Sequence, residues 1–250
     1  MPKKPPFNLL HLIEGMCLFT CITLLTTNDI YGQKTNIDSL KQTIANYEIG
    51  AKVTLQDSTY IDALNELGAS FRFKNNDSLK FLSNQALILS EKANYLTGVI
   101  DASTNLGAYF SDQGNSTNAI NYLKKGLVLS QKQNNDSSTA ALLNDLASEY
   151  SYLGDYAKAL KNFLKGLDIA KANNDILLSS ILNENVANLY ASQKEYDQAL
   201  KFYRVVKRLN RQLGDETVNA ETMSNVAAVY ADMGRFNHAM FNINSSITIF

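Results

Sequence analysis

The stretch LASEYSYLGDYAKALKNFLKGLDIA, residues Leu146 to Ala170, decides the fold of this chain. Apolar and small side chains recur in it at helical spacing on both sides of Gly154. The first stripe consists of Leu143, just before the stretch, with Leu146, Ala147 and Tyr150, and the second of Tyr156, Ala159, Leu160, Phe163, Gly166 and Leu167. Small residues allow two helix backbones to approach, and a glycine ends the first helix. The stretch therefore predicts a pair of antiparallel helices.

The same pattern recurs about every forty residues. Five segments share a small residue followed three positions later by an aromatic one: Gly68 and Phe71, Gly107 and Phe110, Ala147 and Tyr150, Ala187 and Tyr190, and Ala227 and Tyr230. The turn recurs at Gly114, Gly154 and Gly234, with Lys194 in the matching place. A helix pair with one apolar face cannot bury that face alone, so successive pairs must stack. The repeat predicts an elongated, all-α superhelical core.

Residues Leu146 to Ala170 resemble the tetratricopeptide repeat family, whose pattern of Leu, small, Tyr, Gly, Tyr, Ala, Phe and small residues they follow almost throughout. The resemblance extends over residues 57 to 250. It implies a right-handed superhelical solenoid of antiparallel helix pairs, with five repeats and an N-terminal capping helix. The long repeats are similar to those of bacterial sensory proteins and of peptide-binding cargo adaptors.

Two features depart from the family pattern. The period is 40 residues rather than about 34, and no proline closes each unit, because all three prolines lie in the first six residues. Asn and Asp connectors take that place at Asn134 to Asp136, Asn173 to Asp175, and Gly214 to Glu216. We expect the Asp residues of these connectors to act as helix N-caps.

The repeat sets the expected domain organisation. Units are predicted at about 57–95, 96–135, 136–174, 175–214 and 215–250, the last of them incomplete. Residues 33–56 are predicted to form an N-terminal capping helix, because Ile37, Leu40 and Ile44 share one face and the other face is polar. The final helix stops at Phe250 on apolar residues, so we expect the natural polypeptide to continue.

Residues 1–32 are interpreted as a signal peptide. Lys3 and Lys4 precede an apolar stretch that ends at Leu25, and a polar patch leads to an expected cleavage after Gly32. Glu14 and the shortness of the charge-free run argue against a permanent membrane helix. An uncleaved anchor and a cytosolic start are the alternatives. We expect an exported, periplasmic protein, or the periplasmic part of an inner-membrane protein, that meets the membrane only through the signal peptide or an unseen downstream helix.

Both cysteines, Cys17 and Cys21, lie in this N-terminal segment. An exported body would therefore contain neither disulfides nor zinc-thiolate sites. Cys21 is interpreted as an apolar filler, because the apolar run continues beyond it. The alternative is a lipoprotein acceptor.

The composition argues against catalysis and against nucleic-acid binding. The formal net charge is −1, which leaves no basic excess for a phosphate backbone. Only His11 and His238 are present, so a His-paired nucleophile or a His-rich metal site is not expected. The glycines form no phosphate-binding loop. We therefore expect no catalytic, cofactor-binding or metal site and no enzyme activity within these residues.

A candidate binding face follows from the helical geometry. Four positions on the first helix of each unit point away from the packed stripe, and the resemblance implies that this face lines a concave groove. The candidates are Asp101, Asn105 and Asp112 in the second unit, Asp145 and Tyr152 in the third, Asn185 and Asn188 in the fourth, and Glu221, Asn225 and Asp232 in the fifth. The acidic side chains, with Arg72 as the nearest base, favour a neutral or mildly basic partner. The alternative is that they only keep the face soluble.

A polar ladder recurs on this face every forty residues, at Asn105, Asp145, Asn185 and Asn225. An amide both donates and accepts, so it can pair with a peptide unit independently of the ligand's side chains. The resemblance implies that such a ladder holds an extended peptide backbone. The alternative is that each Asn bonds to a neighbouring helix and fixes the stagger of the repeats. The sequence leaves both interpretations open.

We therefore expect an exported module that binds a protein or an extended peptide. By resemblance, it would be the sensory or scaffold region of a larger bacterial signal-transduction protein of the histidine kinase or transcriptional regulator type. The alternatives are a stand-alone periplasmic adaptor in envelope assembly and an accessory region of an enzyme whose catalytic domain lies beyond residue 250.

Overall fold

A computed structural model describes residues 37–49, 58–214 and 216–247, and every regular element in these ranges is a helix. The helices are α3 (Ile37–Ile49), α4 (Ser58–Ser70), α5 (Asn76–Ala93), α6 (Leu96–Asp112), α7 (Ser116–Lys132), α8 (Asp136–Tyr152), α9 (Tyr156–Ala172), α10 (Ile176–Ser192), α11 (Tyr196–Leu213), α12 (Glu216–Asp232) and α13 (Phe236–Ile247). The predicted signal peptide lies outside the described residues.

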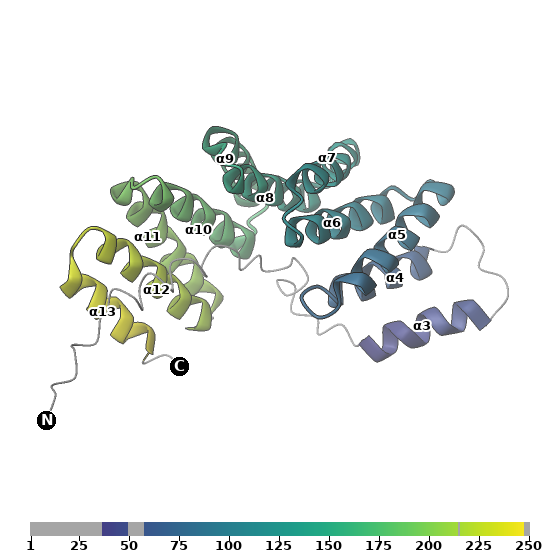
Figure 1. The fold of residues 1–250 in the computed structure, drawn as a ribbon, viewed down its shortest axis with the longest axis horizontal. Helices are drawn as coiled ribbons and strands as arrows, with labels where there is room; N and C mark the ends of the chain where they lie inside the picture. Colours follow the sequence, from purple (N-terminus) through teal and green to yellow (C-terminus); the bar gives the residue numbers. More distant parts are fainter. Residues whose placement is uncertain (1–36, 50–57, 215, 248–250) are drawn as a thin grey trace, which may run out of the picture.

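The helices form five antiparallel pairs that stack into an arch, from α4 with α5 to α12 with α13 (Figure 1). Each second helix also packs on the first helix of the next pair, and successive first helices contact one another. The first helices therefore line the inner side of the arch, and α7 and α9 project on its outer side. The prediction of an all-α solenoid of helix pairs is confirmed, and the five pairs fall within the five predicted units.

The helix α3 lies within the segment predicted to be the N-terminal cap. Its residues Ile44 and Tyr47 pack on the first apolar cluster, and the Tyr47 ring lies 5.4 Å from the ring of Tyr60 on α4. This contact places α3 beside the first pair.

Left-handed residues lie between successive helices, at intervals of twenty residues from Asn94 onward. They are Asn94, Gly114, Asn134, Gly154, Asn174, Lys194, Gly214 and Gly234, with φ between 53° and 76°, and Phe73 between α4 and α5 adopts the same conformation. Glycine and asparagine adopt this conformation at low cost, and it lets a backbone N–H turn back to the helix end. After Gly154, for example, the Asp155 N–H donates to the Tyr150 carbonyl at 2.8 Å. The predicted turns at Gly114, Gly154 and Gly234 are confirmed, and Lys194 adopts the same conformation.

The helix N-caps confirm one sequence expectation and correct another. Asp175 caps α10, because its side chain accepts from the Leu178 N–H at 2.9 Å. At α8, however, the cap is Asn135, and Asp136 is the first helical residue. The prediction for Asp136 is wrong because the left-handed residue is the first of the three connector residues there, whereas it is the second before α10. Asp215 of the third connector lies outside the described residues.

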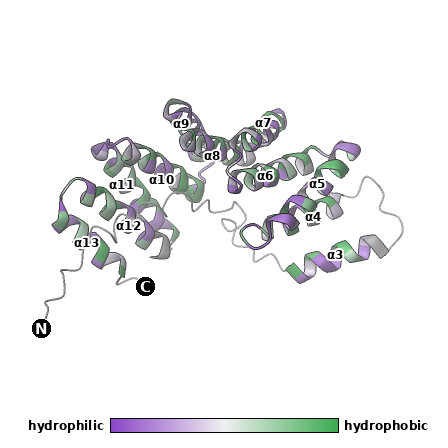
Figure 2. Cartoon of the chain, viewed as in Figure 1, coloured by the Kyte–Doolittle hydropathy of each residue, from purple (hydrophilic) through white to green (hydrophobic). Residues whose placement is uncertain are grey.

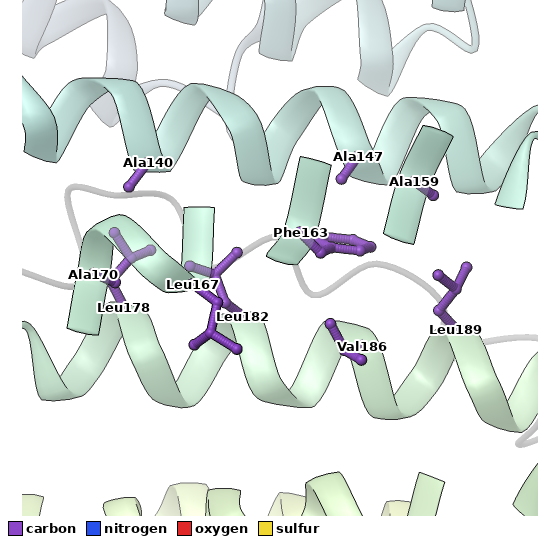
Figure 3. Close-up of a cluster of buried hydrophobic side chains, with 10 residues drawn as sticks. All are labelled: Ala140, Ala147, Ala159, Phe163, Leu167, Ala170, Leu178, Leu182, Val186 and Leu189. Atoms are coloured by element: carbon purple, nitrogen blue, oxygen red, sulfur yellow. The ribbon is translucent and has the colours of Figure 1, made fainter. Parts of the chain in front are cut away.

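Interdigitated side chains between pairs form the core. In Figure 3, Phe163 of α9 lies between α8 and α10, where it meets Ala147 and Val186. Ala147 and Val186 are fully buried, so the small residues of the repeat mark the places where helices approach closely. Figure 2 shows hydrophobic and hydrophilic residues alternating along each helix, as expected of elements with one packed face.

The close packing makes Gly98, near the start of α6, a sensitive position. A Cβ atom there would lie 2.4 Å from Ser90 Oγ, 2.6 Å from Tyr95 Cδ1 and 2.9 Å from Ile61 Cγ2. We predict that Gly98→Ala lowers the free energy of unfolding by about 1–3 kcal/mol through overpacking. The matched control is Ser138→Ala, forty residues later, which adds no atoms and should change stability by less than about 0.5 kcal/mol. Urea unfolding of both variants measures the difference, and equal stabilities would contradict the prediction.

Candidate binding groove

All ten candidate residues lie on the first helices of their pairs, α6, α8, α10 and α12. Tyr152, Glu221 and Asp232 are exposed, and the other seven are partly buried. Asn105, Asp112, Asn185 and Asn225 bond to a neighbouring unit, whereas Asp145 and Asn188 bond within their own unit.

The ladder asparagines bond from one unit to the preceding one. Asn105 Nδ2 donates to the Asn65 carbonyl at 2.9 Å, and Asn185 Nδ2 donates to Asn144 Oδ1 at 2.8 Å. Asn225 Nδ2 donates to Glu184 Oε1 at 2.9 Å. These are the bonds that a stagger-fixing role requires, and each uses only the amide N–H. The Oδ1 atoms of the three asparagines have no hydrogen-bond partner among the described residues.

Two other candidates have internal partners. Asp112 forms a two-pronged ion pair with Arg72, at 2.9 and 3.0 Å, and both side chains are more than 90% buried. Asn188 Oδ1 accepts a hydrogen bond from the Tyr203 hydroxyl. The Arg72–Asp112 pair joins the first two units and removes the nearest base from the list of free cations.

A hollow of about 400 Å³ opens on the concave face where α4, α6 and α8 meet. Three carboxylates line it: Asp62 and Glu66 of α4, and Asp101 of α6. Of the three, only Asp101 was among the candidates predicted from the sequence. Asp62 and Glu66 lie six and two residues before Gly68, just as Asp101 and Asn105 lie before Gly107, so the same spacing would have selected them.

The carboxylates of this hollow disfavour one another's ionised form. Burial, with smaller contributions from the neighbouring Asp62 and Glu66, raises the pKa of Asp101 to about 6. Burial also raises the pKa of Asp62, against a hydrogen bond from Tyr95, and the pKa of Glu66, with Asp62 contributing. The hollow is therefore a place where a cation would relieve repulsion.

Asn65, which also lines this hollow, has a buried amide oxygen without a partner among the described residues. Asn65 is 4% exposed, and its Nδ2 donates to the Gly98 carbonyl at 3.2 Å. Its Oδ1 is buried and has no hydrogen-bond partner in the described part of the chain. A buried acceptor in this state costs free energy until a donor reaches it.

Two further acids outside the hollow also have a raised pKa. Burial raises the pKa of Asp145 to about 6, against the opposing effects of Arg72 and of a hydrogen bond from Asn144. Burial raises the pKa of Glu184 to about 7, against the hydrogen bond from Asn225 and with a contribution from Glu221. Sequence reasoning missed Glu184, because its position faces the next helix rather than the groove and only a contact between units reveals it.

Other kinds of site are not visible in the ranges 37–49, 58–214 and 216–247. Within them, no group of three or more His, Cys, Asp or Glu side chains is arranged to hold a metal ion. No helix there combines the length and apolar character needed to cross a membrane.

Comparison with known families shows which family the chain matches. The sequence profile described as Tetratricopeptide repeat matches residues 98–172 and 177–250, which make up more than half of the chain. The chain belongs to the tetratricopeptide repeat family. Its repeats therefore form a protein-interaction fold, as the sequence predicted. No curated protein sequence matches the chain significantly.

Solved structures show the same fold at low sequence identity. BtubC (BKLC) from P. vanneervenii is 16% identical, with a TM-score of 0.72 over 85% of this chain and 89% of that chain. A Rap protein complexed with competence and sporulation factor is 14% identical, with a TM-score of 0.68 over 85% of this chain and 69% of that one. NprR in complex with its cognate peptide NprX is 16% identical, with a TM-score of 0.63 over 86% and 63%.

The raised pKa of Glu184 predicts a measurable pH dependence of stability. Because the folded state holds the proton more tightly, the stabilising contribution of this proton is complete below the ordinary value of 4.5 and is lost as pH rises through about 7. Glu184→Gln keeps an acceptor for Asn225 and carries no charge. We predict that it raises the free energy of unfolding at pH 8 by up to about 3 kcal/mol, and the melting temperature with it. At pH 4 neither quantity should rise.

Thermal melts between pH 4 and pH 8 check this prediction. The control is Asp168→Asn, which removes a carboxylate from an exposed position on α9. A Glu184→Gln variant that is less stable than the parent at pH 8 would show that the ionised carboxylate is favoured in the folded state.

Proposed function

We propose that the concave face binds an extended peptide or protein segment with a Lys or Arg side chain in the hollow lined by Asp62, Glu66 and Asp101. The observation that carries this proposal is the set of three mutually repelling carboxylates that line one hollow. An ammonium or guanidinium group would donate to these carboxylates and neutralise part of their charge.

The remaining groove suits the backbone of such a segment. The Oδ1 atoms of Asn105, Asn185 and Asn225 remain as acceptors for peptide N–H groups, while their Nδ2 atoms hold the neighbouring unit. A single asparagine can therefore serve both roles between which the sequence could not decide. The Rap and NprR structures, which contain competence and sporulation factor and the peptide NprX, support peptide binding as a use of this fold.

The charge of the groove favours a basic partner over a neutral one. Asp62, Glu66 and Asp101 all have a raised pKa, so a cation in the hollow would offset the cost of ionising them. Arg72, the base nearest to the candidate residues in the sequence analysis, is paired with Asp112. Recognition should strengthen between pH 5 and pH 8, where Asp101 loses its proton.

Calorimetric titration with three short synthetic peptides tests the proposal. The first alternates Lys with Ala, the second replaces Lys with Gln, and the third replaces Lys with Glu. At pH 8, we expect the Lys peptide to bind about tenfold more tightly than the other two peptides. At pH 5, the Lys peptide should bind about tenfold more weakly than it does at pH 8. Asp101→Asn and Glu66→Gln should each weaken binding several-fold, whereas Asp168→Asn on the outer side of α9 should not.

The same titration separates the two roles of the ladder. Double replacement of Asn185 and Asn225 by Ala should lower both the melting temperature and the affinity for the Lys peptide. A lower melting temperature with unchanged affinity would restrict the ladder to a structural role. Equal affinities of the three peptides, or an equal effect of Asp168→Asn, would exclude the cationic subsite.

We further propose that the chain is exported and that its groove serves as the sensory or scaffold part of a bacterial signal-transduction protein. Export is supported by Lys3 and Lys4, the apolar run to Leu25, and the absence of cysteine after Cys21. The signalling role is supported by resemblance to long-repeat sensor regions. A stand-alone periplasmic adaptor and an accessory region of an enzyme are the competing functions, and the gene sequence after residue 250 distinguishes them.

Expression in a bacterium with a periplasm tests the export proposal. We expect the protein in the periplasmic fraction, with an N-terminus at Gln33 by Edman sequencing. A protein that stays in the cytosolic fraction with Met1 or Pro2 at its N-terminus would overturn the proposal. Replacement of Leu24 and Leu25 by Asp should abolish export, because the apolar centre of the signal is lost.

A further inference from the structure

The joint between α11 and α12 departs from the repeat. In the two preceding joints, Gly126 of α7 and Gly166 of α9 lie against the next first helix. A Cβ atom at Gly166 would lie 3.2 Å from the Ala140 carbonyl and 3.3 Å from Leu182 Cδ2, and one at Gly126 would lie 3.2 Å from Leu142 Cδ2. The residue forty positions after Gly166 is Val206, which is fully buried. A branched side chain therefore occupies the place where α7 and α9 have none.

The apolar filling of this joint is also replaced. Leu167 and Leu182 are buried in the core cluster between α9 and α10 (Figure 3). Forty residues later, their places are taken by Lys207 and Thr222. Thr222 is buried and accepts a hydrogen bond from Asn210 Nδ2 at 3.3 Å. The joint has therefore exchanged two core leucines for a cation and a hydroxyl.

A hollow of about 520 Å³ lies at this joint, between α11, α12 and α13. Lys201, Arg204 and Lys207 line one wall, on successive turns of one face of α11, because residues three apart are close on a helix. Met223, Val226 and Tyr230 of α12 line the other wall. None of the groove positions Glu221, Asn225, Ala228 and Asp232 lines it, so the hollow is separate from the concave groove.

Among the described residues, no ion pair neutralises the three cations of this wall. Lys201 donates to Gln198 Oε1 at 3.3 Å, and Arg204 Nε donates to the Leu200 carbonyl at 3.2 Å. No carboxylate of the described residues forms an ion pair with any of the three, and Asp197 is the one acid that lines the hollow. At the equivalent positions α9 has Lys161, Leu164 and Leu167, so the cluster is specific to α11.

We propose that this hollow binds an organic anion that joins a phosphate or carboxylate group to an aromatic or apolar body. The cations hold the anionic group, since a cleft lined by one sign of charge concentrates ions of the other sign. Met223, Val226 and Tyr230 cover the apolar body. The volume is that of a small-molecule site rather than of a protein interface. The proposal is independent of peptide binding in the groove.

The probes are 1-naphthyl phosphate, which has both parts, inorganic phosphate, which has only the charge, and 1-naphthol, which has only the rings. By calorimetric titration, 1-naphthyl phosphate should bind saturably and at least tenfold more tightly than either of the others. The double variant Lys201→Gln, Arg204→Gln should weaken its binding at least tenfold. The matched control, Lys161→Gln at the position of α9 equivalent to Lys201, should leave binding unchanged.

A second variant keeps the test independent of folding defects. Lys207→Leu restores the leucine found at the equivalent position of α9, so it should abolish binding and raise the melting temperature. No saturable binding of 1-naphthyl phosphate at millimolar concentration would overturn the proposal, and so would binding that ignores all three cations. Asp101→Asn should leave the binding of 1-naphthyl phosphate unchanged. This result would distinguish a failure of the anion-site proposal from a failure of the peptide-groove proposal.

Discussion

Close approach between the second helix of one unit and the first helix of the next holds the stack together. Each helix has one apolar face, which no single pair can bury, so stability depends on contacts that cross from unit to unit. Gly126 and Gly166 permit the approach, and side chains such as Phe163 fill the space that remains. Because every unit depends on its neighbours, the positions that set the spacing between units govern both the core and the surfaces around it.

The same spacing creates the polar chemistry of the inner side. First helices lie near enough for Asn105, Asn185 and Asn225 to bond to the preceding unit, and this draws Glu184 into a buried hydrogen bond. Acids that would be ordinary on an isolated helix acquire a raised pKa, because neighbouring helices remove water from them. Groove electrostatics is therefore a property of the stack and not of any one repeat.

At one joint between units, the residues that normally permit close packing are replaced. At the joint between α11 and α12, Val206 replaces a glycine, and Lys207 and Thr222 replace leucines. A hollow with a cationic wall replaces apolar contact at this joint. Buried hydrogen bonds of Asn210 partly replace the apolar packing. One solenoid thus presents an acidic hollow between α4 and α6 and a basic hollow at the α11–α12 joint, although its net charge is nearly zero.

The sequence by itself determined the fold and the forty-residue period of its helix pairs. Small residues, aromatics and turn residues recur at a fixed period, and helix geometry converts that period directly into a stack. Only the tertiary structure decided how the groove residues are paired. Asp112 is held by Arg72, the asparagines reach the preceding unit, and Asp62 and Glu66 meet Asp101 across two helices. These outcomes depend on distances between side chains forty residues apart, which a periodic pattern aligns but does not measure.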